Sequence, residues 1–157
     1  MQLHMRSLEL KVPPVPLAAL FALMMYGVSV ATPAFTFVIP GRVGIAIGLA
    51  LLATVIALAG VVAFRANKTT VNPLNPGAAS AVVSSGVYRF SRNPMYLGFL
   101  LALAGWAVYL SNAATAVLLP VFVLYMNHLQ IKPEERALLA KFGPQFAQYM
   151  SHVRRWI

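Results

Sequence analysis

Two short polar segments stand out in a chain that is otherwise apolar, and their residue types suit the binding of a charged small molecule. The first is Arg89–Gly98, with the sequence RFSRNPMYLG, and the second is the pair Glu134 and Glu135. Arg92 precedes an uncharged run that ends at Ile131, and the glutamates follow that run. If the run folds into a hairpin of two membrane helices, both segments return to the same face of the bilayer. The sequence therefore predicts a pocket between a basic and aromatic segment and a pair of carboxylates.

The composition places the chain among membrane proteins with several spans. Of its 157 residues, 60% are hydrophobic and 10% are charged, and the mean hydropathy is +0.76. Such values lie outside the range of soluble globular domains. The long uncharged segments suffice to cross a hydrocarbon core of roughly 30 Å at about 1.5 Å per residue. We predict an all-α polytopic membrane protein, a single domain over residues 1–157, with four transmembrane helices at about 15–39, 43–64, 94–110 and 113–131.

The basic residues are distributed unevenly about these spans. The net charge is +9, yet with four spans Arg42 is the only Lys or Arg on one side of the membrane. Basic residues concentrate on the cytoplasmic side of membrane proteins. We therefore expect an integral membrane protein of the bacterial inner membrane, with both termini, the loop 65–92 and C-terminal helices over 133–157 at the cytoplasmic face. Topology explains the charge, so we predict no nucleic-acid partner, and the lipid bilayer is the expected surrounding.

The titratable side chains are too few for a dedicated metal site. The chain has no cysteine, three histidines and three acidic residues, and these are scattered along the sequence. Disulfides and thiolate nucleophiles are excluded by the absence of cysteine. We predict no bound metal.

Proline and glycine residues predict local features of the membrane helices. Pro33 lies inside the first uncharged segment and predicts a kinked helix there. Gly44 and Gly48 are four residues apart, a spacing that lets helix backbones approach closely. In the loop that follows, residues 78–83 are expected to form one short surface helix.

The C-terminal region is expected to form two helices. Pro133 followed by the glutamate pair is typical of a helix start, because the helix dipole favours acids in the first turn. Gly143 ends that helix, and an apolar stripe at helical spacing predicts a second one. The second helix lies either on the membrane or back over the bundle. If it folds back, Tyr149 and Arg154 join the pocket.

The residue types of the pocket fit two kinds of cofactor. Arginine holds carboxylates and phosphates, glutamate accepts hydrogen bonds from ribose hydroxyls or an ammonium, and tyrosine faces stabilise a sulfonium or quaternary ammonium. S-adenosylmethionine matches this combination, and a nicotinamide dinucleotide phosphate matches it nearly as well. The sequence contains neither the Rossmann nor the P-loop glycine pattern, so a soluble type of nucleotide-binding fold is excluded.

Several short motifs, taken in their order, resemble the integral-membrane methyltransferases typified by isoprenylcysteine carboxyl methyltransferase and phosphatidylethanolamine N-methyltransferase. The resemblance extends from about Thr69 to Ile157. Its pieces are Ser85-Gly86-Val87-Tyr88, Arg92-Asn93-Pro94-Met95-Tyr96-Leu97-Gly98, Glu134-Glu135, Phe142-Gly143, Tyr149 and Val153-Arg154. In that family an Arg-His/Asn-Pro-x-Tyr-x-Gly element and a Glu pair line an S-adenosylmethionine pocket at the cytoplasmic face.

The resemblance implies roles for particular residues. Those implied to bind the cofactor S-adenosylmethionine are Tyr88, Arg92, Asn93, Pro94, Tyr96, Gly98, Glu134, Glu135 and Tyr149. Arg92, Arg136 or Arg154 could orient an anionic acceptor, and Arg92 and Arg154 are the predicted catalytic residues. Arg154 is preferred for that role since it lies at a matching position of the family.

Asn93 departs from the carboxyl methyltransferases, which carry histidine at this position, and resembles the phospholipid methyltransferases. Asparagine cannot act as a general base, so an acid-base role at this position is not expected. Asn93 also precedes Pro94 and is the expected N-cap of the third span. His128 lies near the end of the fourth span, where a lone histidine is more often structural than catalytic.

The predicted function is S-adenosylmethionine-dependent methyl transfer to a lipophilic acceptor, an isoprenoid carboxylate or a phospholipid-like molecule, at the cytoplasmic membrane face. Two alternatives stay open. One is an NADPH-dependent membrane reductase with a related helical core, and the other is a non-enzymatic small transporter or interaction protein. No charged residue lies inside a predicted span, which disfavours a proton-coupled transporter. The identity of the acceptor and the oligomeric state stay open as well.

Overall fold

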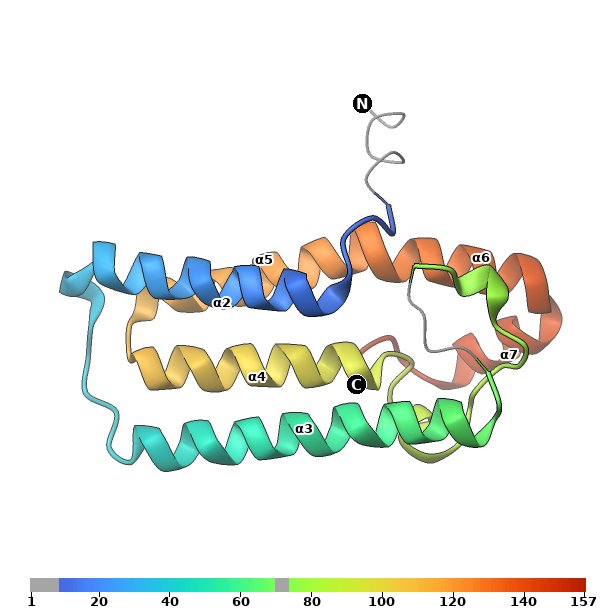
Figure 1. Cartoon of the computed structure of the whole chain (residues 1–157), viewed down its shortest axis with the longest axis horizontal. Helices are drawn as coiled ribbons and strands as arrows, with labels where there is room; N and C mark the ends of the chain where they lie inside the picture. The colour runs from blue at the N-terminus through green and yellow to red at the C-terminus, as the bar shows by residue number, and fades with distance from the viewer. Residues whose placement is uncertain (1–8, 70–73) are drawn as a thin grey trace.

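The computed structural model describes residues 9–69 and 74–157, and these ranges form a bundle of helices (Figure 1). The α-helices are α2 (Pro14–Ala31), α3 (Arg42–Ala66), α4 (Pro94–Leu110), α5 (Leu118–Tyr125), α6 (Lys132–Phe142) and α7 (Pro144–His152). A π-helical segment, η5 (Met126–Ile131), joins α5 to α6. Short 3-10 segments are η1 (Pro33–Phe35), η2 (Pro76–Ala78), η3 (Gly86–Arg89) and η4 (Ala113–Val117). The all-α class is confirmed, and the predicted positions of residues 1–8 and 70–73 fall outside the described residues.

Helix α4 is the central element of the bundle. It lies between α3 on one side and α2 with α5 on the other (Figure 1). Glycines let α3 approach closely: a Cβ added to Gly98 would lie 2.9 Å from the carbonyl oxygen of Ala53, and one added to Gly105 would lie 3.1 Å from another α3 carbonyl. An added Cβ at Gly44 or Gly48 meets no described atom within 4 Å. The predicted close packing at Gly44 and Gly48 is therefore wrong.

The apolar core joins α2, α4 and the helix that starts at α5. Phe21 of α2 packs edge-on against Phe122 of α5, with ring centroids 5.2 Å apart. Met25 and Met126 are fully buried beside them. Trp106 of α4 donates from its indole nitrogen to a carbonyl of α2 at 3.0 Å. This core fixes the positions of the helices whose ends carry the polar residues.

Three helices are long and apolar enough to cross a membrane. They are α2, α3 and the continuous helix Ala113–Phe142, which combines η4, α5, η5 and α6. Helix α4 is apolar but has 17 residues. Many large apolar side chains of α3 face outward, as a lipid-facing helix requires, and they include Leu51, Val55, Leu58 and Val62. Each of the four predicted spans thus contains a helix, and three helices meet the length of a membrane crossing among the described residues.

The first helix ends earlier than predicted. Helix α2 stops at Ala31 and is followed by η1 and an extended stretch, so a kinked helix through residue 39 is wrong. The cause is Pro33, which lacks a backbone N–H and disfavours helical dihedrals at Thr32. The hydroxyl of Thr32 accordingly turns back to the carbonyl of Val28 at 2.7 Å.

The short surface helix predicted over residues 78–83 is also wrong. Only η2 is helical in this region, and the residues after Ala78 are extended or irregular. Ala79 and Val83 of this stretch are buried against the bundle. Lys141 of α6 holds the preceding turn by donating to the carbonyl of Gly77 at 2.6 Å. Residues 79–83 therefore cover the end of the bundle, and we call them the extended wall.

The end of the bundle away from α6 and α7 carries a group of hydrogen-bonded polar residues, which we call the polar turn cluster (Thr32, Thr36, Ser111, Asn112 and Thr115). Asn112 donates to the carbonyl of Thr32 at 2.7 Å and accepts from the backbone N–H of Ala114 at 3.0 Å. The hydroxyl of Thr115 donates to the carbonyl of Asn112 at 2.7 Å. Asn112 and Thr115 are buried. The cluster ties the end of α2 to the turn between α4 and α5.

Candidate functional site

A cavity lies at the other end of the bundle, between the C-terminal end of α3, the start of α4, helices α6 and α7, and the extended wall. Its interior volume is about 100 Å³, and the space between atoms reaches about 680 Å³ when the solvent at its open mouth is included. We call it the Glu134 cavity. Its lining residues are Phe64, Ala79, Ala81, Val82, Val83, Tyr88, Arg92, Asn93, Met95, Tyr96, Glu134, Glu135, Leu138, Phe146 and Tyr149.

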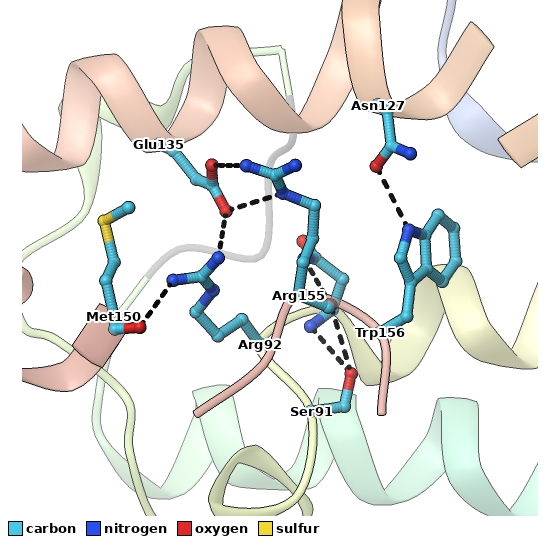
Figure 2. Close-up of polar contacts among 8 residues, drawn as sticks. Ser91, Arg92, Asn127, Glu135, Met150, Arg155 and Trp156 are labelled. Atoms are coloured by element: carbon cyan, nitrogen blue, oxygen red, sulfur yellow. Dashed lines mark hydrogen bonds and ion pairs between the residues drawn. The ribbon is translucent and has the colours of Figure 1, made fainter. Parts of the chain in front are cut away.

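Glu135 is held by two arginines on the wall of the cavity (Figure 2). Arg92 approaches one carboxylate oxygen at 3.0 Å, and Arg155 donates to both oxygens at 3.1 and 2.6 Å. The hydrogen bonds to Glu135 raise the pKa of Arg155. Arg92 also donates to the carbonyl of Met150 in α7 at 3.0 Å. Both oxygens of Glu135 are therefore occupied, and this carboxylate joins α6 to the start of α4 and to the C-terminal tail.

The C-terminal tail after α7 is fixed against the start of α4. The backbone N–H of Arg92 donates to the carbonyl of Arg154 at 3.0 Å, and the side-chain amide of Asn93 donates to the carbonyl of Arg155 at 2.9 Å. Trp156 donates to Asn127 of η5 at 3.0 Å (Figure 2). Asn93 occupies the N-cap position of α4, but its side chain makes no capping hydrogen bond. Its amide is used to hold the tail instead, which closes one side of the cavity.

Glu134 is held differently from its neighbour. The hydroxyl of Tyr96 donates to Oε1 of Glu134 at 2.5 Å, and the side-chain amide of Gln130 donates to the same oxygen. Both donors are uncharged. The other oxygen, Oε2, makes no hydrogen bond or ion pair with any residue that the structure describes. Burial raises the pKa of the Glu134 carboxyl to about 7. Glu134 lines the cavity and keeps one oxygen without a partner among the described residues, which is available to a ligand.

Aromatic side chains also line the cavity. Tyr88 is buried and packs edge-on against Phe64 of α3, with ring centroids 5.2 Å apart. The hydroxyl of Tyr149 donates to the carbonyl of Tyr88 at 2.8 Å. Burial raises the pKa of both tyrosines, so their hydroxyls stay neutral. The cavity thus combines apolar faces with a single open carboxylate oxygen.

The structure brings together most of the residues that the sequence singled out. Those that line the cavity are Tyr88, Arg92, Asn93, Tyr96, Glu134, Glu135 and Tyr149. Pro94 is buried in the first turn of α4, and Gly98 packs against α3. The side chain of Arg154 is exposed and outside the lining, and so is that of His128. The roles assigned to these residues stay predictions.

Sequence reasoning missed Gln130 and Arg155, which hold the two glutamates. Gln130 lies four residues before Glu134, the spacing at which side chains on one helix face meet, and this signal could have identified it. Arg155 stands next to Arg154, and the sequence alone does not reveal which of two adjacent arginines turns inward.

Comparison with known proteins identifies the fold family. Residues 42–145, more than half of the chain, match the family described as phospholipid methyltransferase. The chain belongs to this family. The predicted resemblance is therefore confirmed, and the protein is an integral-membrane methyltransferase by family. The matched range includes α3, α4 and the helix that carries both glutamates, whereas Tyr149 and Arg155 lie beyond it.

Individual relatives of this methyltransferase match over shorter stretches. A protein of Haemophilus influenzae described as uncharacterized is 40% identical over 63 residues, which are 40% of this chain and all of that protein. Protein-S-isoprenylcysteine O-methyltransferase A of Arabidopsis thaliana is 39% identical over 72 residues, 46% of this chain and 36% of the plant protein. Methanethiol S-methyltransferase 1 of Bradyrhizobium diazoefficiens is 36% identical over 67 residues, 43% of this chain and 22% of that protein. The match thus covers about a third or less of the two named enzymes.

Proposed function

We propose that the protein transfers a methyl group from S-adenosylmethionine to a lipophilic acceptor at the cytoplasmic face of the membrane. The observation that carries the proposal is the Glu134 cavity, where one carboxylate oxygen is left open between aromatic walls in a chain of a methyltransferase family. The two differently named relatives act on a protein-bound isoprenylcysteine and on methanethiol, according to their names. They support methyl transfer and leave the acceptor of this chain open.

The residues of the cavity fit the chemistry of this cofactor. Oε2 of Glu134 is placed to accept a hydrogen bond from a hydroxyl or ammonium group. The faces of Tyr88 and Tyr149 suit a sulfonium, because aromatic rings attract cations. Nε of Arg92 is buried without a hydrogen-bond partner among the described residues, which leaves a donor for an anionic group. When bound, S-adenosylmethionine supplies a methyl group activated by its sulfonium.

The protein's contribution to such a reaction is positioning and exclusion of water rather than proton transfer. Asn93 has no proton to exchange near neutral pH, and its amide is occupied by the C-terminal tail. The apolar lining, which includes Phe64, Met95 and Leu138, offers a surface for an acceptor that reaches the cavity from the bilayer. We propose an isoprenoid carboxylate or a phospholipid-like molecule, oriented by Arg92 of the cavity lining or by the exposed Arg154.

We propose the topology with four spans and both termini in the cytoplasm of a bacterial inner membrane. The helix Ala113–Phe142 has 30 residues, about 45 Å, so it exceeds a core of roughly 30 Å. Its charges begin at Lys132, which supports a membrane exit near Ile131 and a cytoplasmic α6. Helix α4 measures about 25 Å and crosses with Asn93 and Ser111 at its ends. The described loop residues 79–92 then cover the cavity on the cytoplasmic side.

Calorimetry on the protein purified in detergent tests the proposed cofactor. We expect S-adenosylmethionine and S-adenosylhomocysteine to bind, and both to lose at least about tenfold in affinity in Glu134→Ala and Arg92→Ala. Glu9→Ala is the matched control, since Glu9 pairs with the exposed Arg136 away from the cavity. Binding of NADPH alone would favour a membrane reductase. Absence of binding by all three ligands would favour a non-enzymatic protein.

A further inference from the structure

The π-helical segment η5 interrupts the helix one turn before the glutamate pair. It places Met126, Gln130 and Ile131 in the interior, whereas His128 is exposed. Its outer side is held by contacts from both ends of the chain: Leu10 donates its backbone N–H to the carbonyl of Leu129 at 3.0 Å, and Trp156 donates to Asn127. Such π-helical turns are uncommon and occur frequently at functional sites, because they redirect one side chain.

Gln130 is the polar side chain that this segment directs inward. It is 3% exposed, does not line the Glu134 cavity, and donates from its amide to Oε1 of Glu134. The hydroxyl of Tyr96 donates to the same oxygen and also lies 3.4 Å from the Gln130 amide. Gln130, Tyr96 and Glu134 therefore form a hydrogen-bonded group, in which one oxygen of Glu134 receives two donors and the other receives none from the residues described.

The chemistry of the two donors matters as much as their geometry. The terminal torsion angle of a glutamate side chain has a broad distribution, so a carboxylate without fixed partners samples many orientations. Two donors to Oε1 select one orientation and point Oε2 at the cavity. The amide and the hydroxyl are neutral donors that orient Glu134 through hydrogen bonds, whereas two guanidinium groups neutralise Glu135.

We propose that Gln130 is a positioning residue for ligand binding: it holds Oε1 of Glu134 so that Oε2 meets a hydroxyl or ammonium group of the ligand. This inference rests on the proposed function, with S-adenosylmethionine as the ligand that supplies such groups. Gln130 acts through Glu134 and touches neither cofactor nor acceptor.

The test compares Gln130→Met with the wild-type protein. Methionine has a similar volume and cannot donate, so we expect affinity for S-adenosylmethionine to fall at least about tenfold, with KM for it raised and kcat at saturation changed much less. Tyr96→Phe removes the other donor to the same oxygen and should act in the same direction. His128→Ala, in the same segment but exposed, is the control and should bind as the wild type does. Unfolding temperatures of all variants report whether they fold.

A double-mutant cycle distinguishes positioning from a general structural role. In a Glu134→Gln background, Gln130→Met should cause little further loss of affinity, because the oriented carboxylate is already gone. The same loss in both backgrounds would overturn the proposal, and so would wild-type affinity in Gln130→Met. If Gln130→Met does not fold, the loss of affinity caused by Tyr96→Phe is compared in the wild-type and Glu134→Gln backgrounds and is judged by the same criterion. Failure of the wild-type protein to bind S-adenosylmethionine would overturn the proposed function itself, and that result is visible without any variant.

Discussion

Both ends of the helix bundle gather polar residues, but only one end leaves some of their atoms without partners. In the polar turn cluster, the amide of Asn112 uses its nitrogen and its oxygen, and the buried hydroxyl of Thr115 has an acceptor. At the cavity end, Oε2 of Glu134 and Nε of Arg92 have no partner among the residues described. Because buried polar groups are normally satisfied within the fold, these open atoms support the proposed ligand site at this end. The satisfied cluster serves the fold.

The same contrast separates the two adjacent glutamates. Glu135 is saturated by Arg92 and Arg155 and joins three parts of the chain, whereas Glu134 keeps one oxygen for the cavity. We therefore expect Glu135 to be needed mainly for stability and Glu134 mainly for binding. Variants at both ends of the bundle test this division.

Glu135→Ala should have the largest effect. Its removal leaves the nearly buried Arg92 and the partly exposed Arg155 without their carboxylate, which should destabilise the protein by about 3 kcal/mol. Denaturant unfolding in detergent measures the loss. Glu9→Ala is the matched control and should cost less than about 1 kcal/mol, because its partner Arg136 is largely exposed. Equal losses of stability in the two variants would show that the ion pairs of Glu135 do not stabilise the fold.

Asn112→Ala should have the next largest effect, and it should change stability without changing ligand affinity. It leaves the N–H of Ala114 without its acceptor and removes one of the two donors to the carbonyl of Thr32, which costs about 1–3 kcal/mol. Affinity for S-adenosylmethionine, measured by calorimetry on the folded variant, should stay within about twofold of the wild type. A large loss of affinity would contradict the separation of the two ends.

Glu134→Gln should have the opposite effect to Asn112→Ala: it should change affinity and leave stability almost unchanged. The substitution keeps the shape of the side chain and removes its charge, so stability should change by no more than about 1 kcal/mol while affinity falls about tenfold. Unfolding and calorimetry on the same preparation compare the two quantities directly. Unchanged affinity would mean that the open oxygen does not meet the ligand.

Much of this architecture could be predicted from the sequence because it follows from hydrophobicity. The uncharged runs located four helices, and the hairpin between Asn93 and Ile131 placed both polar segments at one end. The helix of residues 144–152 was expected from its apolar stripe, and the structure selects the arrangement in which it folds back to bring Tyr149 to the cavity. Hydrophobic patterns of this kind depend on composition summed over many residues.

Features that depend on a single contact could not be predicted in the same way. Gly98 packs tightly against α3 and Gly44 does not, although both are helix glycines, because packing depends on which face a neighbour covers. The extended wall over residues 79–83 is held by tertiary burial, which overrides the local helix propensity. The pairing of Glu135 with Arg155 rather than Arg154 depends on how the tail turns after α7.

Arg154→Ala should have the smallest effect. It tests whether this residue contributes to the function of the cavity end of the bundle. Its side chain is exposed and outside the lining, so affinity for S-adenosylmethionine should stay within about twofold of the wild type. Its backbone carbonyl, which receives the N–H of Arg92, is kept by the substitution. Any effect must therefore arise from the acceptor, and turnover with a lipophilic acceptor measures it. A fall in turnover at unchanged cofactor affinity would support the role in orienting an anionic acceptor, whereas full turnover would remove Arg154 from the catalytic residues and leave Arg92 as the cationic group of the site.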